Sequence, residues 1–393
     1  MAQITLPGVG MTRFSSEDDR SLVDLAATAC RRAVGDAGVE RGDVTSLHVG
    51  TALAEALGQQ SGLANALAGA LGVEGVAADR VENTSATGAT AVHRGIEAVA
   101  SGASDVALVV GAERMSAADT SAVTDAISRL THTREYAQGL TLPSFGGLAA
   151  GAYLDRYDAP HEALAAVAAK NHRNAVANEV AQFRREVSVE EALDSPVVAE
   201  PLRLYDCCPM SDGAAAVIVT RDDRDEVGGG DRRDSDDDRP VRVAAHASAT
   251  GTHPVAERPD PLAIESVRVA GEQLFDAAGV GPDDVDVACI HDAFTVLELI
   301  ELEELGFYEP GTAWKATMEG ETGIDGALPV NPGGGLKARG HPLGATGVSQ
   351  IVELVWQLRG DLPDERRVDG ATWGLAVNVA GFGNNSVCTM LEA

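Results

Sequence analysis

The sequence predicts an α/β protein of two similar halves, because strand and helix patterns alternate, stop and then alternate again along its 393 residues. We place the first half at residues 1–220 and the second at residues 241–393. Between them, residues 221–240 are acidic and rich in glycine, with too little apolar surface to form a core. A chain of this length usually exceeds one compact core, which supports two domains and a solvated linker.

Short apolar runs and helical spacing alternate in the first half. From about residue 116 to residue 199 the pattern changes to loops and long helices, before a strand returns at residues 214–220. We interpret residues 116–199 as a loop domain inserted into this half. The elements that we expect before it are strand 45–50, helix 53–71, strand 76–83, helix 88–101 and strand 106–111.

The alternation restarts after the linker, and its repetition implies parallel sheets covered by helices. Two strands close the chain, and a glycine-rich turn joins them. The elements that we expect in this half are strand 241–248, helix 261–278, strand 285–291, helix 296–305, helix 344–358 and strands 374–379 and 386–391.

The charge of the chain is extreme, with 60 acidic and 30 basic residues and a formal net charge of -30. Only Lys170, Lys315 and Lys337 are lysines, and the other basic residues are arginines. Such a protein would repel itself unless salt screened it, which favours the multimolar-salt cytoplasm of a halophilic microbe. An acidic protein that binds basic partners is the alternative. The charge argues against nucleic acid as a ligand.

The chain also lacks the patterns of membrane and metal-binding proteins. It has no run of about 18 apolar residues and no apolar stretch after a basic start, so we expect a cytoplasmic protein without a membrane partner. Its five cysteines form no Cys-x-x-Cys pair, which disfavours a zinc site. The aspartates of residues 221–240 lack the spacing of a calcium loop. We therefore expect no metal.

Ser85 is the first candidate for chemistry. It lies in the segment Asn-Thr-Ser-Ala-Thr-Gly, at the turn where strand 76–83 runs into helix 88–101. A nucleophile at this place would gain from unpaired N–H groups and from the positive end of the helix dipole. Serine is also a preferred N-cap residue, so this segment alone favours a structural role.

Three further motifs lie at strand ends or turns. His291 follows an apolar strand, and a lone histidine there is more often structural. His341 lies in a loop whose glycines allow a ligand to approach the backbone closely. The loop lacks the Gly-Lys-Ser/Thr and Gly-x-Gly-x-x-Gly patterns of nucleotide sites. The last motif is the glycine turn at residues 378–383 between the two C-terminal strands.

The four motifs, in this order, resemble the thiolase superfamily, and most closely the archaeal and sterol-carrier-protein-type thiolases. The resemblance implies two βαβαβαββ halves in a five-layered α-β-α-β-α arrangement, with the loop domain covering a tunnel for coenzyme A (CoA). The segments that carry it are ENTSATG at residues 82–88, VGAERMS at 110–116, LRLYDCCPMSDGAAA at 202–216, HDAF at 291–294 and NPGGGLKARGHPLGATG at 331–347.

The chain departs from the family at its reactive cysteines. Ser85 stands where thiolases carry the nucleophilic cysteine, and Ala293 and Val379 stand where a second cysteine would move a proton. By resemblance, His341 deprotonates the nucleophile and helps to hold the thioester oxygen. His291 lines the same oxyanion site. A second oxyanion hole would be formed by the N–H groups of Ser85 and Gly381. We therefore expect Ser85, His291 and His341 to be catalytic, because a serine needs an adjacent base.

The resemblance also implies the substrates and partners. We expect a β-ketothiolase, an acetyl-CoA C-acyltransferase that condenses acyl-CoA, such as acetyl-CoA or propionyl-CoA, with acetyl-CoA and catalyses the reverse thiolysis, without a cofactor. The pathway stays open between isoprenoid, fatty acid and polyhydroxyalkanoate metabolism. The alternatives are an acyltransferase or synthase without thiolysis, and an inactive acyl-CoA- or lipid-binding protein. The candidate CoA contacts are Cys208, Arg134, Lys170, His172 and Arg173.

We further expect a homodimer or a dimer of dimers. Archaeal thiolases of this kind often work with a small OB-fold subunit that carries a zinc ribbon, and such a subunit is a possible partner here.

Overall fold

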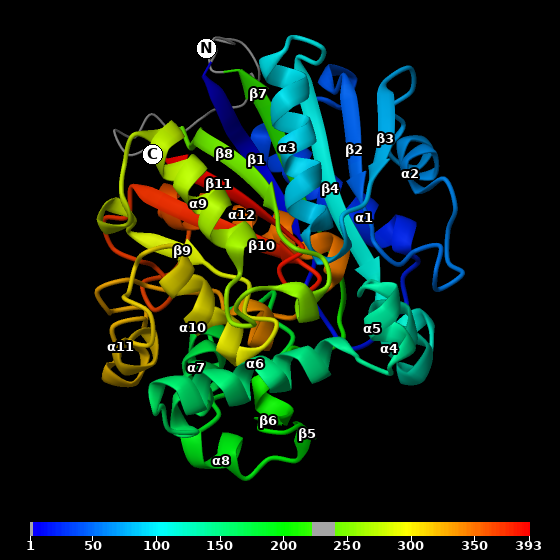
Figure 1. Cartoon of the computed structure of the whole chain (residues 1–393). Helices are drawn as coiled ribbons and strands as arrows, with labels where there is room; N and C mark the ends of the chain where they lie inside the picture. The colour runs from blue at the N-terminus through cyan, green and yellow to red at the C-terminus, as the bar shows by residue number, and fades with distance from the viewer. Residues whose placement is uncertain (1–2, 222–239) are drawn as a thin grey trace.

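A computed structural model describes residues 3–221 and 240–393. The interior of the expected linker, residues 222–239, lies outside the described residues. Within the described part, nine strands form one sheet in the order β3-β2-β4-β7-β1-β8-β11-β10-β9 (Figure 1). Its strands are β1 (Ile4–Met11), β2 (Ser46–Gly50), β3 (Ala77–Val81), β4 (Val106–Arg114), β7 (Asp212–Arg221), β8 (Arg242–Thr250), β9 (Val287–Cys289), β10 (Trp373–Ala380) and β11 (Asn385–Glu392).

The two halves of this sheet have the same strand order. In the first half, numbered along the chain, the order from the outer edge inward is 3-2-4-5-1. In the second half, Val330 forms a parallel bridge with Ala288 of β9 and takes the place of the third strand. With that bridge the second half also reads 3-2-4-5-1. The halves meet where β1 pairs with β8 through Thr5 and Arg242. The sequence-based expectation of two similar halves is therefore matched by the topology.

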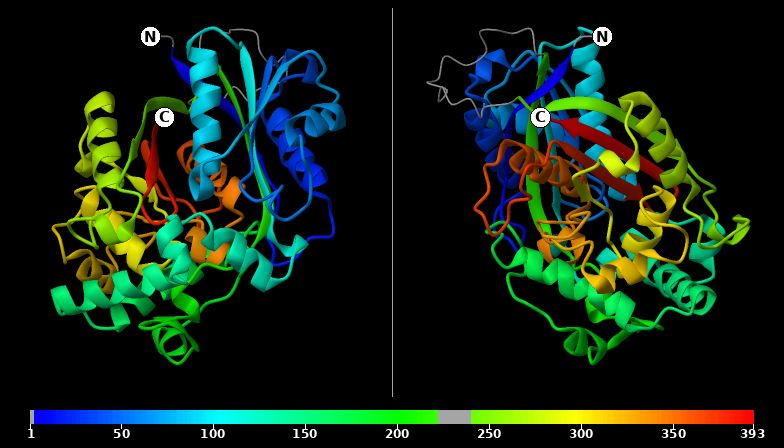
Figure 2. Two further views of the ribbon diagram at one scale, coloured as in Figure 1. Left: turned by 45° about the vertical axis from the view of Figure 1, so that its right-hand side comes forward. Right: turned by 90° about the vertical axis from the view of Figure 1, so that its left-hand side faces the viewer.

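Helices complete five layers around the two half-sheets (Figure 2). Helix α1 packs on β1, β4 and β7, and α9 packs on β8 and β11, so each covers an outer face. Helices α3 and α12 pack against each other and contact strands of both half-sheets. The expected α-β-α-β-α arrangement is confirmed. The bounds of these helices are α1 (Leu22–Ala37), α3 (Thr87–Ala100), α9 (Glu265–Ala278) and α12 (Leu343–Arg359).

The remaining helices cover the sheet edges and build the insertion. Helix α2 packs on β2 and β3 in the first half, and α10 packs against α9 in the second. Short 3-10 segments occur elsewhere in the described chain. These remaining helices are α2 (Leu63–Leu71), α4 (Thr120–Ser128), α5 (Thr133–Ala137), α6 (Leu142–Tyr157), α7 (Glu162–Ala175), α8 (Val189–Leu193), α10 (Thr295–Glu304) and α11 (Ala313–Glu319).

Helices α3 and α12 approach so closely that their backbones touch. A Cβ added to Gly88 would lie 2.7 Å from the carbonyl oxygen of Gly344. A Cβ added to Gly347 would lie 2.2 Å from the backbone nitrogen of Ala89. Both contacts involve the first turns of the two helices, so glycine is needed there for close packing. The N-terminal ends of α3 and α12, with their unpaired N–H groups, are thereby held together.

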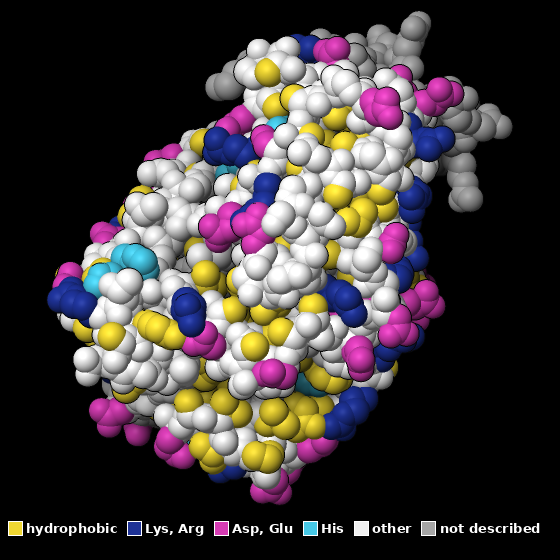
Figure 3. Space-filling view, turned by 90° about the vertical axis from the view of Figure 1, so that its right-hand side faces the viewer, with side chains coloured by type: hydrophobic (Ala, Val, Ile, Leu, Met, Phe, Trp, Pro, Cys, Tyr) yellow, Lys and Arg dark blue, Asp and Glu magenta, His cyan; other side chains and the backbone are white. Residues whose placement is uncertain are grey.

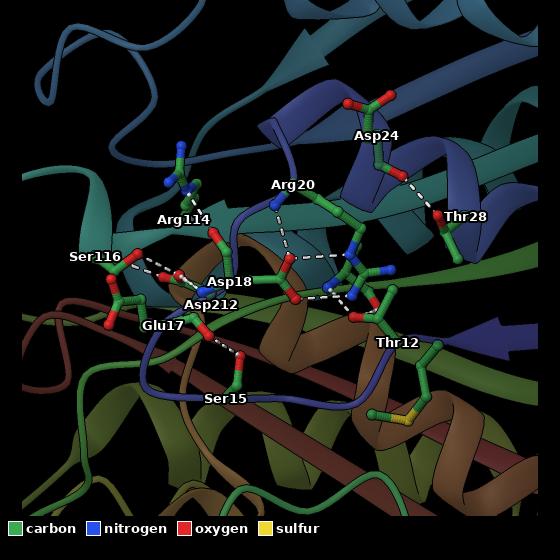
Figure 4. Close-up of polar contacts among 12 residues, drawn as sticks. Thr12, Ser15, Glu17, Asp18, Arg20, Asp24, Thr28, Arg114, Ser116 and Asp212 are labelled. Carbon is green, nitrogen blue, oxygen red and sulfur yellow. Dashed lines mark hydrogen bonds and ion pairs between the residues drawn. The ribbon is translucent and has the colours of Figure 1, made fainter.

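The insertion of the first half leaves and re-enters the sheet at neighbouring strands. Its residues, 115–211, include α4 to α8 and a small hairpin of β5 (Val197–Ala199) and β6 (Leu202–Arg203), seen at the bottom of Figure 1. The carboxylate of Asp212 accepts hydrogen bonds from the backbone nitrogen and hydroxyl of Ser116 and from the backbone nitrogen of Asp18 (Figure 4). One buried side chain thus fastens both ends of the insertion to the loop before α1.

The surface mixes charge and apolar groups. Figure 3 shows acidic and basic side chains over one face, with hydrophobic side chains gathered toward its lower end. Several arginines pair with carboxylates on the surface, among them Arg156 with Asp260 at 2.7 Å. Among the helices of the described residues, none combines the length and apolar character needed to cross a bilayer.

Candidate active site

Ser85 lies between the end of β3 and the start of α3, in the 3-10 turn Thr84–Ala86. Its side chain is buried. The preceding Thr84 has a φ of 46°, a left-handed conformation that costs a threonine about 1–3 kcal/mol. The hydroxyl of Thr84 accepts a hydrogen bond of 3.1 Å from the backbone nitrogen of Gly381. A strained turn therefore presents Ser85 at the N-terminal end of a helix, next to the C-terminal glycine turn.

His341 lies at the N-terminal end of α12, just after the π-helix Gly335–Arg339. Gly340 between them has a φ of 114°, which only glycine adopts readily. The backbone nitrogen of His341 donates to the hydroxyl of Ser211 at 2.9 Å, and its Nδ1 lies 2.8 Å from the hydroxyl of Thr346. The residue is buried, and it is held at its backbone nitrogen and at one ring nitrogen.

His291 follows β9 and is also fully buried. Its backbone nitrogen donates to the Glu301 carboxylate at 3.0 Å, and its Nδ1 lies 2.8 Å from Nδ2 of Asn378. The rings of His291 and His341 meet edge to face, with centroids 5.2 Å apart. The structure therefore brings the two predicted histidines together.

Burial keeps both histidines neutral near neutral pH. It lowers the pKa of His291 well below the usual value, with a further lowering from His341. It lowers the pKa of His341 to about 3, and the charge of Arg339 lowers it further. A neutral imidazole has one bare nitrogen that can accept a proton and one N–H that can donate a hydrogen bond. The pair can therefore supply a base and a donor.

The turn that holds Ser85 packs against α12 and β10, the elements whose Thr346 and Asn378 contact His341 and His291. Among the described residues, however, no hydrogen bond joins the Ser85 hydroxyl to either histidine. The N–H of Gly381, expected in an oxyanion hole, instead donates to Thr84. Catalytic hydrogen bonds often form only with substrate in place, so this geometry describes the free enzyme.

The buried carboxylate of Asp292 connects the loops that carry the two histidines. Asp292 accepts hydrogen bonds from the backbone nitrogens of Leu336 and Lys337, at 2.7 and 3.1 Å, and so ties the loop of His291 to the π-helix before His341. Burial and the neighbouring Glu298 raise the pKa of Asp292 to about 6. The HDAF motif is visible in the sequence, but this connection between the two loops is revealed only by the fold.

The candidate CoA contacts do not form one cluster. Lys170 is buried, and its ammonium lies 2.6 Å from Glu298. His172 is buried too, and desolvation lowers its pKa to about 4. Arg134 is exposed and paired with Glu257. Arg173 is exposed and, with Lys170, lines a cavity of about 350 Å³ between α7 and α11.

Cys208 is the candidate that lies beside the histidine loop, because its backbone nitrogen donates to Ala293 at 2.9 Å. Burial raises the pKa of the Cys207, Cys208 and Cys289 thiols to about 12. It raises the pKa of the Cys30 and Cys388 thiols further. All five cysteines are therefore thiols near neutral pH, and a thiolate that could replace Ser85 is absent from them.

The described residues also contain no group of three or more histidine, cysteine, aspartate or glutamate side chains arranged to hold a metal ion. The chemistry that the site itself offers is proton transfer by two neutral histidines, and a hydroxyl nucleophile at a helix N-terminus.

Comparison with known proteins identifies relatives of this chain. The acetyl-CoA acetyltransferase of Methanothermobacter thermautotrophicus is 39% identical over 387 residues, which is 98% of each chain. Sterol carrier protein 2 of Gallus gallus is 32% identical over 99% of this chain and 71% of that protein.

Solved structures agree in fold. An aldolase complex described as Ltp2-ChsH2(DUF35) has a TM-score of 0.84 at 26% identity, over 100% of this chain and 98% of that one. Human mitochondrial 3-ketoacyl-CoA thiolase has a TM-score of 0.76 at 17% identity, over 100% and 99%. The family models "Thiolase, N-terminal domain" and "Thiolase C-terminal domain-like" match residues 7–223 and 247–393. The chain belongs to the thiolase family and is an acyltransferase.

Proposed function

We propose that this enzyme is a β-ketothiolase that transfers acyl groups between CoA thioesters through an acyl-serine at Ser85. The main support is the meeting of two helix N-termini, one carrying the Ser85 turn and the other His341, with His291 against His341. Helix N-termini stabilise developing negative charge, as an acyl-transfer reaction requires.

The reaction has two half-steps. In the first, His341 takes the proton of the Ser85 hydroxyl as its oxygen attacks the thioester carbonyl. The C–S bond breaks, and CoA leaves with that proton. In the second, a histidine takes the α-proton of acetyl-CoA, and the resulting carbanion attacks the acyl carbon. The bond from that carbon to Ser85 breaks, the proton returns to the serine oxygen, and 3-oxoacyl-CoA is released.

Several finer features belong to the same proposal. Acetyl-CoA, and also propionyl-CoA, would serve as acyl donors, and Cys208 and Arg173 are the CoA contacts that best fit their places near the site and at a cavity rim. We propose a dimer, because thiolases typically form oligomers. We also propose the cytoplasm of a salt-adapted organism, on the basis of the net charge of -30. A small subunit is supported by the DUF35 partner named in the related aldolase complex.

The test is intact-protein mass spectrometry after incubation with acetyl-CoA. We expect one acetyl group on the parent, mapped by peptide analysis to Ser85, and none on Ser85→Ala. Release of 3-oxoacyl-CoA from the acetylated parent on adding acetyl-CoA would complete the cycle. An unlabelled parent that still forms 3-oxoacyl-CoA would rule out the acyl-serine.

A second candidate is carbon–carbon bond cleavage of a 3-hydroxyacyl-CoA without an acyl-enzyme. Two observations favour it: the related structure named an aldolase, and the missing hydrogen bond between Ser85 and the histidines among the described residues. Release of an aldehyde or ketone from a 3-hydroxyacyl-CoA, undiminished in Ser85→Ala, would favour this candidate. Binding of acyl-CoA with neither reaction would favour the inactive binding protein.

A further inference from the structure

The two histidines of the site differ in what holds their Nδ1 atoms. Nδ1 of His291 lies 2.8 Å from the amide nitrogen of Asn378, and Nδ1 of His341 lies 2.8 Å from the hydroxyl of Thr346. A neutral imidazole carries a proton on only one of its nitrogens. The partner of Nδ1 therefore decides whether Nε2 donates or accepts a hydrogen bond.

Thr346 makes His341 an acceptor at Nε2. The single hydroxyl proton of Thr346 is donated to the carbonyl oxygen of Pro342 at 3.1 Å. Toward His341 the hydroxyl can then only accept, so Nδ1 of His341 carries the ring proton and Nε2 is bare. A bare Nε2 is the state that a base for Ser85 requires.

Asn378 has the opposite effect on His291. The side chain is fully buried at the end of β10, and its amide nitrogen can only donate. Nδ1 of His291 must then accept, and the ring proton lies on Nε2. The two neighbouring rings thus hold their protons on different nitrogens.

The positive end of a nearby helix favours the orientation of the Asn378 side chain in which its nitrogen faces His291. Its oxygen lies against the first turn of α3, because a Cβ added to Gly347 would meet Asn378 Oδ1 at 2.5 Å and the Ala89 nitrogen at 2.2 Å. The positive end of α3 favours an oxygen there over an NH₂ group. Within the described residues this oxygen has no direct hydrogen-bond partner, so the helix end is what sets its preference.

We propose that Asn378 is a positioning residue that fixes the ring proton of His291 on Nε2, so that His291 donates to the acyl oxygen while His341 accepts the proton of Ser85. The choice of the acyl oxygen as acceptor rests on the proposed function. The fixing of the proton itself rests only on the contacts of Asn378.

Asn378→Asp should reverse the proton position. A carboxylate can only accept, so Nδ1 of neutral His291 would carry the proton and Nε2 would be bare. The carboxylate would also raise the pKa of His291, and below that pKa the imidazolium donates from both nitrogens. We expect a kcat about 10²-fold below that of the parent near pH 8, the usual cost of one lost oxyanion donor. The ratio of variant to parent kcat should rise as the pH is lowered toward about 6.

Other groups facing His291 titrate in the parent and in Asn378→Asp alike, so the ratio of variant to parent kcat is the correct readout. They are His341 just before α12, Glu301 on α10 and the adjacent Asp292. Asn384→Asp is the matched control, since Asn384 lies in the same turn region and caps Phe382 instead of touching His291. Its kcat ratio to the parent should not change with pH. A pH-independent ratio for Asn378→Asp would overturn the proposal.

A direct measurement keeps the proposal testable if Asn378→Asp fails to fold. Protonated and bare ring nitrogens differ in ¹⁵N chemical shift, so the substrate-free parent labelled with ¹⁵N-histidine can be read, with His291→Gln and His341→Gln used for assignment. We expect the proton on Nε2 of His291 and on Nδ1 of His341. A proton on Nδ1 of His291 would refute the role of Asn378, even if Ser85 is acetylated. The expected positions without acetylation would refute only the acyl-serine.

Discussion

The two halves share one strand order but join their last two strands differently. In the first half, β4 and β7 are joined by the insertion of residues 115–211, whereas in the second half β10 and β11 are joined by the turn at residues 381–384. The tight turn places Asn378 beside His291 and Gly381 beside Thr84. The second half thus supplies the histidines and the side chains that contact their rings, while the first supplies the Ser85 turn, the large insertion and Ser211, which holds the His341 backbone.

The largest expected effect acts on both halves alike. With a net charge of -30, we expect loss of structure and activity below roughly 0.5 M KCl, because longer screening lengths increase self-repulsion. Circular dichroism and activity across a KCl series would measure this, with sucrose as a control for non-ionic stabilisation. Full stability in dilute buffer would refute adaptation to salt.

Substitutions at the meeting helix ends should remove activity without unfolding the chain. Ser85→Ala and His341→Ala should each lower the rate of 3-oxoacyl-CoA cleavage by about 10³-fold or more, and the double variant should be little worse, because a nucleophile and its base act as a unit. If the loss in the double variant equalled the product of the two single losses, the two residues would act independently. Ser85 and His341 would then not form a nucleophile and its base.

Ser85→Cys should stay active and become sensitive to iodoacetamide, if Ser85 stands, as the sequence resemblance implies, where thiolases carry a nucleophilic cysteine. The parent should resist, because its own thiols have pKa values raised by burial. A folded but inactive variant would indicate a pocket spaced for oxygen. Activity that resists iodoacetamide would exclude residue 85 as the nucleophile.

Two glycine-to-alanine substitutions should show by their effects on stability whether the close contact between α3 and α12 requires glycine. Gly347→Ala should destabilise the protein by about 3 kcal/mol, because its Cβ would meet the Ala89 backbone at 2.2 Å. Gly69→Ala in α2 meets nothing within 4 Å and should stabilise by up to about 1 kcal/mol. Urea unfolding at constant salt gives both values. Equal changes in the free energy of unfolding for the two variants would mean that the α3–α12 contact relaxes easily.

The smallest effect concerns a second histidine pair, which joins the halves. His93 of α3 contacts Thr389 of β11 at 3.1 Å, and its ring lies 4.7 Å from that of His246. Burial lowers the pKa of His93 from 6.5 to about 3. The unfolded chain therefore binds a proton below pH 6.5 that the folded chain excludes, and stability falls as the pH drops from 6.5 toward 3.

At pH 5 the lowered pKa of His93 reduces the free energy of unfolding by about 2 kcal/mol, since each pKa unit corresponds to about 1.4 kcal/mol. His93→Gln does not titrate and should lose that much less stability than the parent between pH 7 and pH 5, measured by urea unfolding. His161→Gln, at an exposed position, is the control and should behave as the parent does. Identical pH dependence in parent and His93→Gln would show that His93 is not the group responsible.

Sequence patterns predicted the repeated strand–helix order well where the elements are long and apolar. The expected helix 344–358 is α12, and the expected strand 106–111 lies within β4. The expected elements did not include α1 or β1, and the ITLPGVGM sequence of β1 contains a proline and two glycines that weaken a strand pattern. The expected helix 53–71 was too long, because α2 begins only at Leu63.

The candidate site also contains residues that sequence motifs indicate and residues whose role depends on contacts in the fold. Ser85, His291 and His341 were found because each lies in a continuous motif, and their catalytic roles stay predictions. Asn378 was not found, because its importance comes from a contact between β10 and the loop after β9. Lys170 was expected to contact CoA, and the sequence did not show that the fold buries its ammonium beside Glu298. A sequence shows charge, but not which charges a fold pairs inside it.

The fastening at Asp212 has an evolutionary consequence. Arg114 and Asp212 are paired neighbours on adjacent antiparallel strands, so the insertion is in effect an enlarged hairpin loop with its two ends side by side. Such a segment can be lengthened, shortened or exchanged without altering the order of the sheet. Among descendants of one ancestral gene, we therefore expect substrate range to diverge through residues 115–211 while the short turn at 381–384 changes little.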